Sequence, residues 1–188
     1  MQEIEIEFKN LLTKEEYKRL YTALPFPRRA QTQINYYFDT AQFSLQNEQC
    51  ALRIRKKNNS YRLTLKEAHE YGVLETHDSL TENIAVQWIQ GNVIAQPNTT
   101  KQLNKMSISP EDLRYYGSLT TRRREYKEND LLYVLDHSTY NNREDYELEI
   151  EAPCEEVGIR AFHQLLKQYT ILKKKTPNKI ERFFTTLS

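Results

Sequence analysis

Charged side chains of one sign recur at every second position in four segments of the chain. Carboxylates alternate with apolar residues at positions 3–7 and again at 147–151, and basic side chains do the same at 52–55 and 62–66. Because successive side chains of a strand point to opposite faces, each segment would gather its charges on one face. Clustered carboxylates suit a hard divalent cation, whereas clustered lysines and arginines suit phosphate groups. Together the segments predict a site for a metal-bound polyphosphate.

An ordinary half-exposed sheet, with its charged face in water, is the favoured interpretation for any single segment. The separation of sign between segments argues against it for the whole set. Two like charges 4 Å apart repel by about 4 kcal/mol at an effective dielectric near 20, so a row of them needs counter-charges. If the sheet closes, its apolar side packs against outer helices and its charged side lines the interior.

The elements that would carry these residues are mainly strands. Alternation predicts eight of them, at residues 2–9, 34–39, 51–56 and 60–66, around Glu75, and at residues 119–126, 131–136 and 145–151. Many antiparallel strands with some helices outside are typical of an α+β chain and favour a barrel. The four expected helices run from a Thr13 capping box to Leu24, from a Ser79 capping box to Ile89, over a short segment from Pro110 to Gly117, and over residues 153–169.

Length and composition exclude several classes of protein. With 188 residues the chain is expected to form a single domain, 1–188. Lys+Arg is 27 and Asp+Glu is 26, a net charge of +1, so neither nucleic acid nor a membrane is expected to bind through bulk charge. No run of about 18 apolar residues and no signal segment is visible, and the two cysteines are far apart, which favours a cytoplasmic protein. The oligomeric state stays open.

Residues 5–9, EIEFK, resemble the ExExK signature of the CYTH proteins, also called triphosphate tunnel metalloenzymes. The similarity continues in order through YYFDT at 36–40, LRIR at 52–55, LTLK at 63–66, LD at 135–136 and ELE at 147–149. ExExK alone is a weak pattern, but the ordered set is specific and spans nearly the whole chain. The resemblance implies a closed eight-stranded antiparallel β-barrel with helices packed outside. Its tunnel would bind a triphosphate-containing small molecule with Mg²⁺ or Mn²⁺.

The resemblance also implies roles for individual residues. Two acidic positions on other strands would complete the site as catalytic residues, and Glu3 and Glu151 share the charged faces outside the signature. The residues carried over are Glu5, Glu7, Glu147 and Glu149 for the metal, Lys9, Arg53, Arg55, Lys66 and Arg123 for phosphate, and Glu75 and Asp136 for catalysis.

Three features leave alternatives open. The family's late basic strand usually carries Lys-x-Arg, and here residues 122–124 are three arginines, of which Arg123 is expected to point inward. His77 lies two residues beyond Glu75 and has a slight claim to the same face. The lysines of residues 173–179 either close the tunnel or, as we favour, form a solvated helix end.

The function implied by the resemblance is metal-dependent hydrolysis of a triphosphate, such as tripolyphosphate, thiamine triphosphate or a nucleoside triphosphate. The absence of an evident catalytic serine, cysteine or histidine suits phosphoryl transfer, which depends on positioning and charge neutralisation. One alternative is a class IV-type adenylate cyclase that makes cyclic AMP from ATP. The other is a non-catalytic module that binds polyphosphate or nucleotide.

Overall fold

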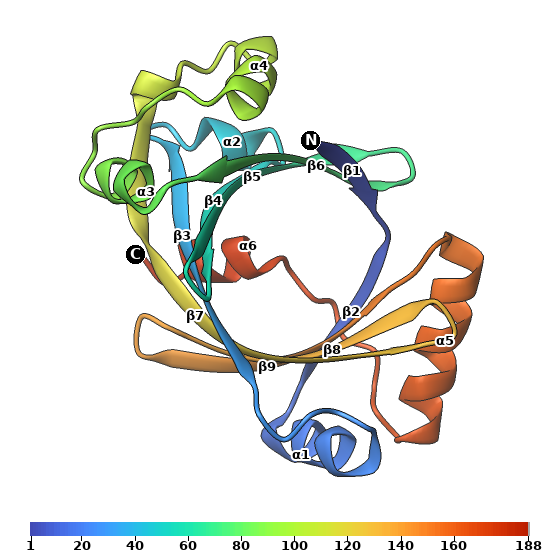
Figure 1. Ribbon diagram of the computed structural model, residues 1–188. Helices are drawn as coiled ribbons and strands as arrows, with labels where there is room; N and C mark the ends of the chain where they lie inside the picture. The colour runs from blue at the N-terminus through green and yellow to red at the C-terminus, as the bar shows by residue number, and fades with distance from the viewer. Residues whose placement is uncertain (188) are drawn as a thin grey trace. The chain divides into compact units, whose positions relative to one another are not determined.

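The computed structural model describes residues 1–187 and contains nine β-strands and six α-helices in that range (Figure 1). The strands are β1 Gln2–Glu5, β2 Glu7–Leu12, β3 Gln31–Thr40, β4 Ala51–Lys57, β5 Ser60–His69, β6 Gly72–Leu80, β7 Leu113–Glu128, β8 Leu131–Tyr140 and β9 Arg143–Glu151. The helices are α1 Lys14–Ala23, α2 Ser44–Asn47, α3 Glu82–Ile89, α4 Pro97–Lys105, α5 Glu155–Gln168 and α6 Lys179–Phe184.

The described residues form two compact units. The first unit holds residues 1–4 and 33–119, and the second holds residues 5–32 and the chain from Thr120 onward. The strands of each unit are antiparallel and have one apolar face, so the predicted α+β class is confirmed. No helix of residues 1–187 has the length and apolar character that crossing a bilayer requires.

In the first unit the strands follow the order β1-β6-β5-β4-β3, and the first half of β7 continues it. Leu52 and Ile54 on β4 and Leu63 and Leu65 on β5 are completely buried on the apolar face. Helices α3 and α4 cover this face, and Trp88 of α3 lies edge-on to the ring of Phe38 with centroids 5.2 Å apart. The alternate residues of the same strands, which carry the charges, are therefore left on the opposite face.

In the second unit the order is β7-β8-β9-β2. Leu135, Leu148 and Ile150 are buried beneath α1 and α5, which pack against β2 and β9. Helix α6 lies against the other face of the same sheet, where β9 carries its glutamates (Figure 1). One face of this sheet is thus an ordinary apolar core, and the other is charged and partly covered by a short helix.

The strand number departs from the expected eight. Ile6 interrupts the predicted strand 2–9, because its carbonyl accepts a hydrogen bond from the Ala152 N–H just beyond the end of β9 (2.9 Å). The residues before it form β1, which pairs with β6, and those after it form β2, which pairs with β9. The closed eight-stranded sheet is therefore corrected to nine strands, whose order has two ends, β1 and β2.

Two of the expected helices begin or end differently. The Thr13 capping box and α5 are confirmed, but Ser79 lies inside β6, and Thr81 caps α3 by accepting a hydrogen bond from the Ile84 N–H. The segment after Pro110 is a single 3-10 turn, and Gly117 lies within β7 rather than closing a helix. Strand pairing overrode the capping signal of Ser79, whereas Ser109 does cap its turn and β7 begins directly after it, at Leu113. Helices α2, α4 and α6 were not predicted.

Candidate functional site

The charged face of the second unit carries a row of carboxylates on neighbouring strands. Glu147 and Glu149 lie two residues apart on β9, so both point away from the face that holds Leu148. Asp136 of β8 is the cross-strand neighbour of Glu147. All three carboxylates are almost completely buried, with 0 to 5% of each residue exposed. Buried carboxylates need close positive charges or bound cations.

Lys179 brings one such charge into the middle of this row. Its Nζ lies 3.0 Å from Asp136 Oδ2 and 3.1 Å from Glu147 Oε1, and it also donates to Glu149 Oε1. Lys179 is the first residue of α6, and its position is fixed by the capping box that Asn178 forms with Glu181. Only 9% of its side chain is exposed, so the expected solvated helix end is wrong for this lysine.

Arg123 supplies a second charge from β7. Its Nε and Nη2 donate to the two oxygens of Asp136 at 2.9 and 2.6 Å, and Nη2 also donates to Glu149 Oε2 at 2.6 Å. Arg123 is thus the arginine of residues 122–124 that points to the charged face, and Asp136 holds it in a two-point contact.

Arg182, one helical turn after Lys179, completes the set of cations. Its Nε donates to Asp145 Oδ2 at 2.9 Å, and its Nη2 donates to Glu147 Oε2. The two oxygens of Glu147 therefore each form an ion pair with a different cation of one short helix.

Burial and these charges move the pKa values in opposite directions within the row. Burial raises the pKa of Glu147 more than the neighbouring Lys179 and Arg182 lower it. Burial would also raise the pKa of Glu149. The positive charges of Arg123 and Lys179 lower it by more, so the pKa of this carboxyl lies well below its usual range. For Lys179 burial disfavours the ammonium, and the surrounding carboxylates more than compensate, which raises its pKa. The row therefore strongly favours a cation at its centre.

The ExExK residues lie at the edge of the same unit. Lys9 of β2 pairs with Glu7 at 2.7 Å and also donates to the side-chain oxygen of Asn178. Lys9 is the cross-strand partner of Glu149. Glu5, the last residue of β1, is half-buried.

The donor set fits a hard divalent cation. Three carboxylate oxygens, from Asp136, Glu147 and Glu149, converge on a single nitrogen atom, the Nζ of Lys179. Oxygen ligands that converge on one point are what Mg²⁺ and Mn²⁺ require. Carboxylates are the type of ligand that such an ion takes, and in this structure the ammonium of Lys179 lies among the three.

The first unit contains a second charged cluster. Lys66 of β5 pairs with its cross-strand neighbour Glu75. His77 Nε2 lies 2.9 Å from Glu3 Oε1 and 3.3 Å from Glu75 Oε2, while its Nδ1 is 3.0 Å from the Thr64 hydroxyl. Sequence reasoning had placed Glu3 outside the signature and gave His77 only a slight claim.

Three buried donors of the first unit have no acceptor within residues 1–187: Gln33 Nε2, Asn35 Nδ2 and Arg53 Nε. Cross-strand pairing of β3 with β4 sets Asn35 opposite Arg55, whose Nε donates to the Asn35 side-chain oxygen at 2.9 Å. Arg53 lies two residues before Arg55 on the same face. Buried donors without acceptors, beside two arginines, suit an anion with several oxygen atoms.

The predicted residues thus gather in two groups, each described within its own unit. Arg182 is the member that sequence reasoning missed, and Lys179 was considered but assigned to a solvated helix end, although the capping pattern of Asn178 and Glu181 was readable. The second unit holds Glu5, Glu7, Lys9, Arg123, Asp136, Glu147 and Glu149, and the first holds Arg53, Arg55, Lys66 and Glu75.

The chain resembles known proteins over nearly its whole length. The family model described as the CYTH domain matches residues 3–184. A protein of Bacillus subtilis (strain 168) named "Putative triphosphatase YjbK" is 47% identical over 184 residues, which cover 97% of this chain and 95% of that protein. The chain belongs to the CYTH domain family.

Solved structures share the fold. A "putative adenylate cyclase" from Bacillus halodurans is 38% identical, with a TM-score of 0.93 over 97% of this chain and 98% of that one. The Hippeastrum protein HpAC1, described as an adenylyl cyclase with a dominant triphosphatase activity, has a TM-score of 0.79. It is 24% identical, and the match covers 98% of this chain and 96% of that one. At this identity the similarity shows a shared fold and nothing more.

Proposed function

We propose that the protein is a divalent-metal-dependent triphosphatase that hydrolyses a triphosphate-containing small molecule. The observation that carries the proposal is the convergence of Asp136, Glu147 and Glu149 on one cationic atom. Family membership and the 47% identical relative named as a triphosphatase support it. The buried, acceptor-free donors beside Arg53 and Arg55 support an anionic substrate rich in oxygen.

The metal would be held by carboxylates of the second unit. Glu147 and Glu149 would be joined by Glu5 and Glu7 of the ExExK segment, and Asp136 would hold Arg123 in place through its two hydrogen bonds. Bound there, Mg²⁺ or Mn²⁺ would offset phosphate charge and lower the pKa of an attacking water.

The family resemblance implies which basic side chains would bind the substrate's phosphates, and these are Lys9, Arg53, Arg55, Lys66 and Arg123. Glu75 would act by holding the ammonium of Lys66, with which it is paired. Such a site works by positioning and by neutralising charge, which is what phosphoryl transfer needs.

The test is release of orthophosphate from tripolyphosphate, thiamine triphosphate and ATP with Mg²⁺ or Mn²⁺. Glu149→Gln and Lys9→Ala should each lose activity at least about a hundredfold, a typical effect of removing an electrostatic contact in an active site. Glu70→Gln, a change on an exposed residue of the β5–β6 turn, should be unaffected. Failure of the wild-type protein to release phosphate from any of these compounds would overturn the proposal.

An adenylate cyclase is the second candidate, because the 38% identical structural neighbour carries that description. The two activities differ in their products. Cyclic AMP and pyrophosphate from ATP would identify the cyclase, and orthophosphate would identify the hydrolase. Tight triphosphate binding with neither product would instead indicate a non-catalytic binding module.

We also propose that residues 1–188 act as one domain, which the family match over residues 3–184 supports. A cytoplasmic location is proposed as well, since Cys50 and Cys154 are both free thiols.

A further inference from the structure

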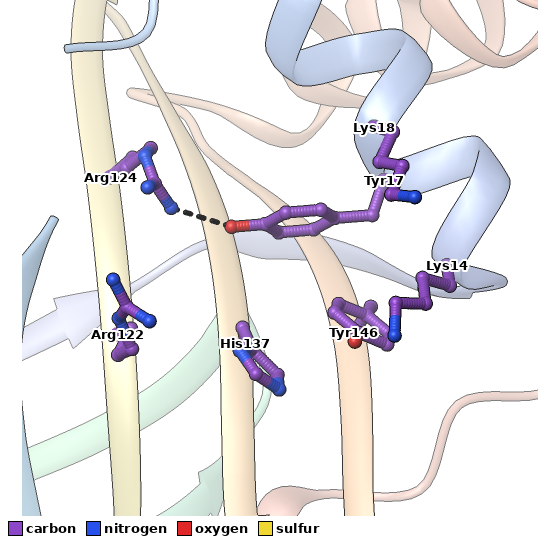
Figure 2. A pocket seen from close by; sticks show the side chains of 7 residues that line it. All are labelled: Lys14, Tyr17, Lys18, Arg122, Arg124, His137 and Tyr146. Atoms are coloured by element: carbon purple, nitrogen blue, oxygen red, sulfur yellow. Dashed lines mark hydrogen bonds between the residues drawn. The ribbon is translucent and has the colours of Figure 1, made fainter. Parts of the chain in front are cut away.

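A pocket opens on the face of the second unit that is opposite to the carboxylate row. Strand alternation separates the two faces: Arg123 and Asp136 point to the carboxylates, whereas Arg122, Arg124 and His137 point to the pocket. Helix α1 forms the other wall, as Figure 2 shows. The pocket has a volume of about 180 Å³ and is separate from the site described above.

Positive charge dominates this pocket. Lys14 and Lys18 line it from α1, and Arg122 and Arg124 line it from β7. Two carboxylates lie near the pocket: Glu144, which is half exposed and lies 4.0 Å from Lys14 and 2.8 Å from His137, and Glu15, whose charge acts on Tyr146. Surfaces normally intersperse charges of both signs, so four cations around one pocket repel one another.

Two of these cations have no counter-charge of their own. In the chain from residue 1 to 187, the side chains of Lys18 and Arg122 form no ion pair and no hydrogen bond. Their α1 and β7 backbones nevertheless hold them on opposite walls of the pocket (Figure 2).

Two contacts fix the position of the Arg124 side chain. Its Nη1 donates to the Tyr17 hydroxyl at 2.6 Å, and its guanidinium lies over the ring of Tyr21, 4.5 Å from the centroid. Because Tyr17 accepts this hydrogen bond, its own hydroxyl proton is available to a ligand in the pocket. The ring of His137 stacks on Tyr146 at 4.6 Å, so the floor of the pocket is fixed as well.

We propose that this outer pocket binds a phosphate group, either inorganic phosphate or the terminal phosphate of a small phosphomonoester. Arginine and tyrosine donors on fixed supports match the several oxygens of a phosphate. A volume of about 180 Å³ leaves room for a phosphate group. The proposal does not rest on the triphosphatase activity.

His137 provides a local reporter, because the chain has four histidines and only this one lines the pocket. Inorganic phosphate and methyl phosphate are titrated separately into the full chain at constant ionic strength, and the ring protons of His137 are followed by NMR. Saturable shifts with phosphate, and none with chloride, are expected. A response to methyl phosphate but not to phosphate would assign the site to phosphomonoesters, and the reverse would assign it to the free ion.

The matched variants are Lys18→Gln with Arg122→Gln, and Lys175→Gln as the control on an exposed lysine. The double variant should weaken the apparent affinity by at least about tenfold, since each lost contact is a charge-assisted hydrogen bond. The control should match the wild type. The proposal is overturned if the His137 protons do not move with either phosphate compound, or if the double variant responds like the wild type.

Discussion

Glu147 and Lys179 form an ion pair of 3.1 Å in which a helix of only six residues delivers its first side chain into a row of carboxylates. Arg182 of the same helix binds the other oxygen of that glutamate. The C-terminal segment therefore supplies two of the positive charges that the row needs in the absence of a metal ion.

Replacing Lys179 should favour metal binding. In Lys179→Met the ammonium no longer competes for the three carboxylates, so affinity for Mn²⁺ measured by calorimetry should rise by at least about tenfold, or ~1.4 kcal/mol. The metal-free variant should melt at a lower temperature than the wild type, because the carboxylates then repel one another. Lys175→Met is the matched control, and an unchanged Mn²⁺ affinity in the Lys179 variant would contradict the competition.

Arg123 and Arg122 should differ sharply in their effect on stability. Arg123→Met leaves Asp136 and Glu149 buried without their guanidinium, and breaking a buried pair in this way typically costs about 3–5 kcal/mol. Arg122→Met changes an exposed residue and should stay within about 0.5 kcal/mol. Urea denaturation measures both, and similar losses in the two variants would argue against the inward orientation of Arg123.

The sequence was sufficient to predict how side chains alternate between the two faces of a strand. The period of two placed Glu147 and Glu149 on one face, because burial of the intervening apolar residues fixes which way a strand faces. Alternation alone could not decide which arginine of residues 122–124 points inward, and the contacts of Arg123 with Asp136 and Glu149 decide it. The same reasoning could not find the neighbours that arrive from elsewhere in the chain. Lys179 follows a stretch with no periodicity, and its partners lie 30 to 43 positions earlier (Glu149 and Asp136).

Gly158 of α5 should not tolerate alanine, although alanine normally favours a helix by about 1 kcal/mol over glycine. A Cβ at this position would collide with the ring of Phe8 and would come within 2.7 Å of the Ala152 Cβ. We expect Gly158→Ala to lower the free energy of unfolding by about 1–3 kcal/mol, the usual cost of overpacking.

A double-mutant cycle separates this collision from other effects of Gly158→Ala. Phe8→Leu shortens the side chain that the new methyl group meets, so part of the loss should be recovered in the double variant. Chemical denaturation of the wild type, the two single variants and the double variant gives the coupling energy between the two changes. Simple additivity of the two changes would mean that the helix does not pack as closely as described.

The two cysteines should differ in their reactivity. Burial raises the pKa of the Cys50 thiol to about 11, so at pH 8 only about one molecule in a thousand carries the reactive thiolate. Cys154 is exposed at the N-terminus of α5 and should react rapidly with a disulfide reagent. We expect one rapidly reacting thiol in the native protein and two in the protein unfolded by guanidinium.

Cys154→Ser provides the check on that assignment, because the native variant should then show no rapid reaction at pH 8. Raising the pH toward 11 should speed the slow thiol as its thiolate fraction grows. Two rapid thiols in the native wild type would contradict the burial of Cys50.

The boundaries of helices and strands were the weakest part of the sequence-based prediction, because contacts with other strands decide them. Two N-caps compete at the start of α3: Ser79, which has Glu82 three residues later, and Thr81, which has no such partner. Ser79 pairs with Arg62 across β5 and β6, and this pairing leaves Thr81 as the cap. Ile6 looks like any other residue of an alternating strand until its carbonyl is seen to bond to Ala152. Such outcomes depend on partners distant in sequence, which propensity does not encode.

The division of each sheet into one apolar and one charged face has a consequence for mutational selection. On the charged face, buried ion pairs are often no better for stability than well-packed apolar residues of similar size. A library selected only for heat resistance should therefore accept apolar residues at Arg123, Asp136, Glu149 and Lys179 when all four change together, while it keeps Leu148 and Ile150. A library selected for activity should impose the opposite pattern on the same strands.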